Sequence, residues 1–598
     1  MEPQQSLSGR VVSRIVGNVC RIRLSVALLV LVGAAPAVSM FYLVTHYWVP
    51  LPYWDEWATP GKMFASWCDG TLTLPDLVSQ HNESRKFFPR LLYLALAVAG
   101  GWDVRKEMLV CFATVCAIAL LFYRLMRQTP GATALSAAIG WTAATFLCFS
   151  AVQLDNFLWG IQLEPFFPGL AVLAIAVVNT SERSLARKSL LNATLALIAT
   201  YTFANGMLLW AIGVPTRGRS EAITRQQVCL SYGGYALTAA LAIGAYFIHY
   251  ERPANHPQLM ADRTALVPLL HYLVLWVGSY FASPAVSPLA VGITAIAVFA
   301  AALIGAVVSI TRNREWRSCY PALLIAAYAC VTAAVTAVGR IGFGVEQALD
   351  SRYRTFSLFF YLAIVALLFA LYCRSVLIGN TRWQIRFIGG CSVVAIAASA
   401  AWVFCYFHEL RYVENLYSRN LTLIRALEWI NVIPDNPDVL FIYPIEEQIL
   451  ERARVVRDHK LLRLPYPNQS VIGTVQRLPP DPVDQTFGRM ETCMFDTNHN
   501  LYITGWARLP TRHHHADTIV IGCQDSTGNY KPFSVMNTEL AATKTGRRSK
   551  TPLVRFARAF NAANVPKGEI TIAAWAVDMP GEKAYPLGGA THIQQDQR

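Results

Sequence analysis

Long apolar runs fill the first two thirds of the chain and limit what it can fold into. Crossing a bilayer takes about 20 apolar residues, and eleven runs approach that length, near 24–46, 107–125, 131–150, 164–178, 189–203, 205–214, 228–248, 289–311, 319–339, 356–374 and 385–406. Charged residues make up only 15% of the chain, against roughly 25% in soluble domains. This composition excludes a disordered chain, a collagen, a small disulfide scaffold and an ordinary cytosolic enzyme. It predicts a polytopic α-helical membrane protein.

Basic residues predict which loops face the cytoplasm, where Lys and Arg are enriched. Arginines precede the first run, and further basic clusters lie at 124–127, 183–188, 217–225, 312–317 and 374–386. All of these basic clusters lie on one side of the membrane only if two shorter apolar stretches, 88–101 and 266–283, do not cross it. We interpret both as helices at the outer interface. The prediction is eleven spans in a bacterial inner membrane, with the N-terminus cytoplasmic and residues 407–598 periplasmic.

The net charge of +14 follows from the same loops, so no nucleic-acid partner is predicted. We expect no cleaved signal peptide, because the first run is too long and ends in the bulky segment Met40–Leu43. The shortest run, 205–214, crosses only if it packs inside the helical bundle.

Unusual polar residues gather in the loops that this topology places outside. The first outer loop opens with Pro50–Trp57, in which Asp55 and Glu56 lie between two tryptophans. A carboxylate at the lipid–water boundary is partly desolvated, which raises its basicity. The alternative is an aromatic belt with two solvated carboxylates. The first interpretation makes Asp55 and Glu56 candidate catalytic groups.

Further candidate binding residues follow along the outer loops. The first loop continues with Gln80–Arg85 and Phe87–Arg90, which either bind an anionic headgroup or form a solvated loop start. The second outer loop, Gln153–Glu164, places polar groups near membrane depth, where they are expensive unless paired or lining a wet cavity. A helix-cap role for Asp155 is the alternative there. The candidates from both loops are His81, Asn82, Glu83, Arg85, Arg90, Asp155, Asn156, Gln162 and Glu164.

The outer loop near 340–355 carries arginines on the side that the charge rule disfavours. They either pair with Glu346 and Asp350 or bind phosphate, which arginine grips through two parallel hydrogen bonds. We favour phosphate because the loop is basic overall. The candidates here are Arg340, Glu346, Arg352, Tyr353 and Arg354.

In this order, these features resemble the GT-C superfamily of membrane glycosyltransferases, which includes the protein mannosyltransferases and the lipid A aminoarabinose transferase. The resemblance covers residues 1–406. It rests on an acidic pair after the first span, a long first outer loop with juxtamembrane helices, the joint Gly101–Arg105, and Asp155 in the second outer loop. The Trp-rich segment after Asp55 and the cluster His81–Arg85 depart from the superfamily pattern. These departures leave the identities of the sugar donor and of the acceptor open.

The resemblance implies inverting transfer of a sugar from a polyprenyl-phosphate-linked donor to a cell-envelope glycan or lipid acceptor. Asp55 would act as the base, with Glu56 as runner-up. Arg340, Arg352 and Arg354 would stabilise the leaving phosphate. The remaining candidates would orient donor and acceptor, and Arg85 and Arg90 would bind an acidic headgroup or anchor the juxtamembrane helix. The sequence requires no cofactor; a divalent cation at Asp55, Glu56 and Asp155 stays open.

Three other functions stay open at this point. A transporter or flippase of lipid-linked glycans explains the spans and the arginines, but it predicts charged groups at mid-span. A glycan polymerase or ligase would act on similar lipid-linked substrates. A non-enzymatic assembly scaffold predicts that removing the Asp55 carboxylate has no effect.

Charges and turn residues increase after residue 406. Residues 407–484 read as a mixed α/β connecting region, with helices at 409–432 and 445–456, a strand at 439–443 and a Pro-rich linker at 464–483. Residues 485–598 predict a β-sandwich with strands near 486–495, 499–507, 517–524, 551–559, 569–577 and 590–594.

Three features of this outer domain carry alternatives. Trp506 and Trp575 are predicted as core residues, the alternative being a sugar-stacking platform. Cys493 and Cys523 are the two cysteines here, and an oxidising compartment would permit a disulfide. The run His513–His515 is predicted to form an exposed turn, with metal binding as the alternative.

Overall fold

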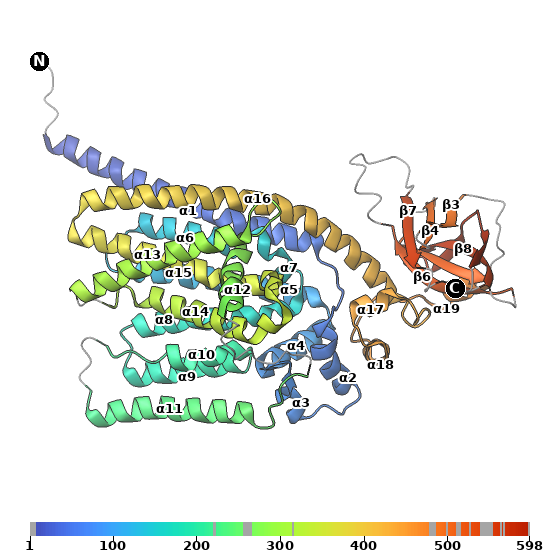
Figure 1. Ribbon diagram of the computed structural model, residues 1–598, viewed down its shortest axis with the longest axis horizontal. Coiled ribbons are helices and arrows are strands. Elements are labelled where there is room, and N and C mark those ends of the chain that lie inside the picture. Colours follow the sequence, from blue (N-terminus) through green and yellow to red (C-terminus); the bar gives the residue numbers. More distant parts are fainter. Residues whose placement is uncertain are drawn as a thin grey trace, which may run out of the picture. The chain divides into compact units, whose positions relative to one another are not determined.

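The computed structural model describes residues 7–218, 223–254, 266–313, 316–477, 486–497, 500–509, 516–524, 528–538, 554–561, 565 and 568–595 (Figure 1). The run His513–His515 lies outside them. The chain divides into two compact units. The first contains residues 1–48, 73–92 and 106–413, and the second contains residues 49–72, 93–105 and 414–598. The first outer loop is therefore divided between the two units.

Helices make up the first unit, with one two-stranded hairpin, β1 (Gln80–His81) and β2 (Ser84–Arg85). In Figure 1 most of its long helices run roughly side by side. The helices, of which α4, α5 and α16 have residues in both units, are α1 (Leu7–Tyr47), α3 (Leu74–Val78), α4 (Phe87–Gly100), α5 (Val104–Gln128), α6 (Ala134–Cys148), α7 (Leu154–Phe157), α8 (Leu163–Thr180), α9 (Leu185–Thr200), α10 (Leu208–Ile212), α11 (Arg225–Phe247), α12 (Leu266–Gly278), α13 (Pro288–Asn313), α14 (Tyr320–Arg340), α15 (Ser351–Ile378) and α16 (Thr381–Glu428).

The described residues contain eight helices long and apolar enough to cross a membrane, or nine if the bent pair α6–α7 counts as one span. The prediction of eleven spans is therefore too high. The difference lies in the runs 189–203 and 205–214. Helix α9 has 16 residues and α10 has five, so at 1.5 Å per residue they reach only about 24 Å and 8 Å. The hydrocarbon core is about 30 Å thick, so neither reaches across it alone. The two ambiguous stretches are helices below spanning length, as predicted.

Close packing inside the helical unit depends on small residues at helix crossings. Gly169 in α8 lies against the ring of Phe359 in α15, and a Cβ at this position would be 1.8 Å from the ring atom Cζ. Any larger residue at this position would therefore force the Phe359 ring to move. Small residues let membrane helices approach closely, because lipid provides no hydrophobic drive for helix association.

The helices of the second unit correct two sequence predictions. Residues 439–443 were predicted as a strand, but Asp438–Ile442 form α17. The apolar, β-branched run misled the prediction, since short runs of this kind do not distinguish strand from helix. The predicted linker at 464–483 contains α19 (Gln469–Arg477). The helix predicted at 409–432 is the end of the continuous α16, and that at 445–456 is confirmed as α18 (Glu446–Asp458). A further helix, α2 (Lys62–Cys68), lies in the first outer loop.

The C-terminal strands form two antiparallel sheets, drawn in orange to red in Figure 1. One sheet has the order β3-β4-β7. The other has the order β10-β8-β5-β6, with β9 paired to β8. The strands are β3 (Gly488–Phe495), β4 (Asn500–Ala507), β5 (Thr518–Gln524), β6 (Tyr530–Asn537), β7 (Val554–Asn561), β8 (Gly568–Asp578), β9 (Lys583–Pro586) and β10 (Thr591–Gln595).

All six predicted strands are present within a few residues, and β6 and β9 are additional. Strand β6 contains Pro532, and proline is disfavoured in strands because it cannot donate to a ladder. It is tolerated because β6 ends its sheet as an edge strand. Alternate residues of both sheets, among them Ile503 and Ile572, bury one shared core.

The structure also describes the two cysteines and the two tryptophans of the outer domain. Cys493 and Cys523 are not joined by a disulfide; the thiol of Cys523 donates to the carbonyl of Lys531 at 3.7 Å. Trp575 is 1% exposed, as expected of a core residue. Trp506 is only partly buried.

Candidate functional site

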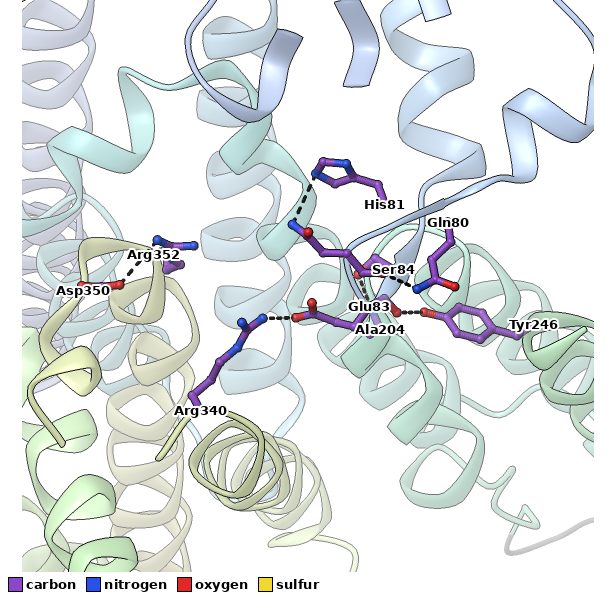
Figure 2. Close-up of polar contacts among 10 residues, drawn as sticks. Gln80, His81, Glu83, Ser84, Ala204, Tyr246, Arg340, Asp350 and Arg352 are labelled. Carbon is purple, nitrogen blue, oxygen red and sulfur yellow. Dashed lines mark hydrogen bonds and ion pairs between the residues drawn. The ribbon is translucent and has the colours of Figure 1, made fainter. Parts of the chain in front are cut away.

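The hairpin β1–β2 presents the candidate residues of the first outer loop. Its turn is only two residues long, and Asn82 adopts a left-handed backbone conformation with φ of 48°. Asparagine tolerates this region better than most residues. The Tyr246 hydroxyl at the end of α11 donates to the carbonyl of Glu83 at 2.5 Å, and the amide of Ala204 donates to Ser84 Oγ at 3.2 Å (Figure 2). The hairpin is thereby held in one position within the first unit.

Arg85 and Arg90 are buried and bind backbone carbonyls near the hairpin. Arg85 Nε donates to the carbonyl of Tyr246 at 2.6 Å and Nη1 to that of Val78 at 3.0 Å. Arg90 Nη1 donates to the carbonyls of Leu77 at 3.0 Å and Ser79 at 2.6 Å. Of the two roles expected for these arginines, the contacts favour anchoring of the loop.

Charged residues from three separate segments meet beside the hairpin. Arg340, at the last turn of α14, forms an ion pair with Glu83 (Figure 2). Asp350 and Arg352, at the start of α15, form a second pair at 3.5 Å. Tyr353 is buried next to them, and Glu346 is exposed on a short 3-10 turn. The structure thus brings Glu83 of the first outer loop together with Arg340 of the 340–355 loop.

His81 occupies the same region in a neutral form. Its Nε2 lies 3.5 Å from Asn82 Nδ2. Partial burial, together with the positive charges of Lys86 and Arg90, lowers the pKa of His81 to about 2. The imidazole is therefore uncharged at neutral pH, so it offers one hydrogen-bond donor and one acceptor rather than a cation.

The lowered pKa of His81 predicts a pH dependence of stability. The unfolded chain has the ordinary pKa of about 6.5, so between pH 2 and 6.5 it binds more protons than the folded protein. The free energy of unfolding should therefore rise with pH through this window and level off above it. We expect His81→Gln to lose a few degrees less than the wild type in melting temperature between pH 7 and 5, measured on detergent-purified protein. Parallel pH curves for the two proteins would contradict this assignment.

A buried ion pair links the first outer loop to the second. Lys86 Nζ lies 2.7 Å from Glu164 Oε2, and the two side chains are 6% and 1% exposed. Lys86 directly follows the hairpin, and Glu164 stands in the first turn of α8. Breaking such a pair leaves an uncompensated buried charge. Glu164 therefore serves to hold the hairpin in place on α8.

Polar groups of the second outer loop bind the start of α15. Asn156 Nδ2 donates to Gln153 Oε1 at 2.7 Å and to the carbonyl of Ser351 at 2.8 Å. Arg354 Nη1 donates to Glu409 Oε1 at 3.1 Å, and Glu409 is 3% exposed. Gln153 Nε2 in turn donates to the carbonyl of Arg354 at 3.0 Å. Arg354 thus has a carboxylate partner inside the protein, and the network fixes the helix start that carries Arg352 and Tyr353.

Asp155 and Gln162 complete the second loop. Asp155 is half-buried, and Gln162 is buried within its 3-10 turn. The side-chain oxygens of Gln162 and Asn156 are enclosed without a hydrogen-bond partner among the described residues. Such groups are uncommon in folded proteins, so this loop retains unused capacity for hydrogen bonding.

Asp55 and Glu56 belong to the second unit. Glu56 is 1% exposed, and its Oε2 accepts the amide of Tyr53 at 2.7 Å. Asp55 is half-buried. The segment is held by backbone contacts of its neighbours: the amide of Trp54 donates to the carbonyl of Ile442 at 2.8 Å, and Arg452 donates to that of Trp57 at 2.7 Å. Glu56 therefore stabilises its own turn, which leaves Asp55 as the more accessible carboxylate.

The joint Gly101–Arg105 also has a structural explanation within the second unit. Arg105 binds the carboxylate of Asp103 through a fork, with Nη2 2.7 Å from Oδ2. The amide of Trp102 donates to the carbonyl of Leu461 at 2.7 Å. Trp102 packs edge-on against Trp57, with ring centroids 5.0 Å apart.

Lys86 and Glu409 are charged contact residues that sequence reasoning missed. Lys86 stands between the polar hairpin and an apolar helix, and Glu409 follows the last apolar run. In each case the only signal was a lone charge at the boundary of a long apolar helix, which is ambiguous because charges are common there.

Within the described residues, no group of three His, Cys, Asp or Glu side chains is placed to hold a metal ion. Comparison of the chain with protein-family profiles, with curated proteins and with solved structures finds no match. The helix lengths, the hydropathy and the two C-terminal sheets establish the class alone. The chain is a polytopic helical membrane protein with a C-terminal β-sheet domain.

Proposed function

We propose that this protein transfers a sugar from a polyprenyl-phosphate-linked donor to a cell-envelope glycan or lipid acceptor at the outer face of a bacterial inner membrane. The supporting observation is the charged group beside the hairpin, where Arg340 and Arg352 lie at the adjoining ends of α14 and α15. Each arginine already faces a carboxylate, so its guanidinium is oriented before any ligand binds. Arginines of this kind stabilise a phosphate on which negative charge develops.

The reaction needs few other groups. The acceptor hydroxyl oxygen attacks the anomeric carbon as the bond to the phosphate oxygen breaks, and the hydroxyl proton passes to a carboxylate. A phosphate leaves without a general acid, so one base suffices and the anomeric centre inverts. Neutral His81 and the exposed Asn82 supply hydrogen bonds to sugar hydroxyls. The assignment of Asp55 as the base stays a prediction from the sequence.

The experiment compares envelope glycans of the native host by mass spectrometry. A deletion strain is complemented with wild type, with Asp55→Asn, or with Asp69→Asn, which changes an exposed carboxylate of the same segment. We expect one sugar mass to vanish in the deletion and to return with wild type and Asp69→Asn. Loss of the general base should lower transfer by about 10²–10⁴-fold, so Asp55→Asn should not restore that mass at matched protein levels.

Other outcomes point to the other functions. Accumulation of a complete lipid-linked glycan in the deletion strain would indicate a transporter or flippase. Loss of chain length with unchanged repeat composition would indicate a polymerase or ligase. Full restoration by Asp55→Asn would reject Asp55 as the base, and Glu56→Gln would then be tested in the same way.

A further inference from the structure

The three-stranded sheet β3-β4-β7 has an outward face with an unusual composition. Tyr502, Thr504 and Trp506 alternate along the central strand β4 on this side. The register places Met494 opposite Tyr502, and it places Arg489 and Arg555 on either side of Trp506. One end of the face is therefore apolar and aromatic, and the other combines an aromatic ring with cations.

This face is not part of the hydrophobic core. The core positions of β4 are the alternate residues Leu501 and Ile503, both 0% exposed. On the outward side Tyr502 is 40% exposed and Met494 is 57% exposed. The two tryptophans that the sequence paired thus have different roles, since Trp575 is buried while Trp506 lies on the outward face.

Cations outnumber carboxylates on this face. Arg489 is exposed, Arg555 is 73% exposed, and the guanidinium of Arg508 lies 5.7 Å from the ring of Trp506. Among the described residues of these three strands the one carboxylate on this side is Glu491, 3.2 Å from Arg555. An ion pair this exposed is weak, so it does not prevent Arg555 from binding an anion. The face is therefore complementary to a negatively charged ligand.

The middle of the face carries small side chains and hydroxyl groups. Thr492 and Ala557 flank Thr504 in register. Trp506 stands four positions after Tyr502 along the strand, so the two rings are about 13 Å apart at a rise of roughly 3.3 Å per residue. This spacing suits an extended ligand of several units rather than one small molecule.

We propose that this face binds an acidic oligosaccharide. The apolar face of one sugar ring packs on Tyr502, the sugar hydroxyls bond to Thr492 and Thr504, and carboxylates on the glycan bind Arg489 and Arg555. The proposal is independent of the proposed transferase activity, because it concerns binding by the C-terminal domain alone.

The test measures binding of fluorescent hexagalacturonate to the purified full-length protein in nanodiscs of neutral lipid. Its fully methyl-esterified form has the same sugar rings without the charges. We expect wild type to bind the acidic form more tightly than the ester. Tyr502→Ala should weaken binding of both forms by about tenfold. The double variant Arg489→Gln/Arg555→Gln should weaken binding of the acid by tenfold or more and remove the preference for it.

The matched control removes two positive charges from the other sheet. Lys531 and Lys583 are exposed on β6 and β9, and Lys531→Gln/Lys583→Gln should bind the acidic hexamer like wild type. If this control and the arginine variant lost binding of the acidic hexamer equally, the effect would be one of net charge alone, and the proposal would be overturned. Wild-type binding by Tyr502→Ala and the arginine variant would overturn it as well. A third outcome would also overturn the proposal. If the protein floated with phosphatidylglycerol vesicles in a way that depends on the two arginines, and did not bind hexagalacturonate, the face would be assigned to a lipid surface.

Discussion

Arg340→Gln is expected to lower sugar transfer by about 10²–10³-fold with little change in protein level. Arg340 and its partner Glu83 have side-chain exposures of 18% and 30%, so losing their pair costs less folding free energy than losing the buried Lys86–Glu164 pair. Charge on a leaving phosphate would lose its counter-ion. The measurement is transfer to the envelope glycan by membranes that contain matched amounts of protein. The transfer rate of Arg340→Lys should fall between those of wild type and Arg340→Gln, because lysine keeps the charge but not the two parallel hydrogen bonds.

A double variant separates phosphate binding from a structural role. If Arg340 acts only by neutralising Glu83, then Glu83→Gln/Arg340→Gln should recover activity, since neither charge remains. If Arg340 binds the donor phosphate, the double variant should stay as inactive as Arg340→Gln. Arg411→Gln, at an exposed arginine of α16, is the matched control and should retain full transfer. Recovery in the double variant would remove Arg340 from the phosphate site.

Lys86→Ala and Glu164→Ala are each expected to destabilise the helical unit by about 3–5 kcal/mol. Both side chains are nearly inaccessible to water, so removing either one leaves the other charge buried without the counter-ion of this pair. The double replacement Lys86→Met/Glu164→Leu should be much less destabilising than either single change, because it removes both charges and keeps the volume. The measurement is thermal unfolding of detergent-purified protein, followed by intrinsic fluorescence.

The exposed pair Asp350–Arg352 provides the control. Its side chains are 40% and 49% exposed, so Asp350→Asn should change stability by less than about 1 kcal/mol. If Lys86→Ala were as mild as Asp350→Asn, the Lys86–Glu164 contact would not be a buried ion pair in solution.

The C-terminal strands were predictable from the sequence because alternation and turn residues act locally. Strand β4 alternates buried and accessible residues along its whole length, as a period of two requires. Strand β6 escaped prediction because Pro532 reads as a breaker, and its tolerance depends on a position at the sheet edge that only the tertiary structure defines. The strand predicted at residues 439–443 was wrong for a related reason: five residues are too few to show whether the apolar positions repeat with the period of a strand or of a helix.

The candidate site was predictable as a set of residues and not as a set of contacts. The charge rule disfavours arginine in the outer loops of a membrane protein, so Arg340 and Arg354 stand out in the sequence, and Glu83 stands out within the polar cluster Gln80–Arg85. Their partners follow from packing between segments far apart in the chain. Arg354 meets Glu409, 55 residues away, and no local pattern indicates that pairing. The predicted number of spans was too high because hydropathy shows that α9 and α10 are apolar but does not show where each helix ends.

The division of the first outer loop between two units has a consequence for the order of folding during synthesis. Residues 49–72 and 93–105 leave the ribosome early, yet their partners in the second unit lie beyond residue 413. The contacts of Trp54 with Ile442 and of Trp102 with Leu461 therefore form only when most of the chain has been made. At about 5–20 residues per second, the early segments wait for tens of seconds.

During that interval Trp57 and Trp102 lack the surface that later covers them. Membrane insertion of the intervening helices therefore proceeds before these apolar side chains have met all of their partners. For the same reason, a cut near residue 406 does not yield two self-sufficient pieces: the C-terminal piece would lack two segments that belong to its own unit, and the bundle would carry them without their partners.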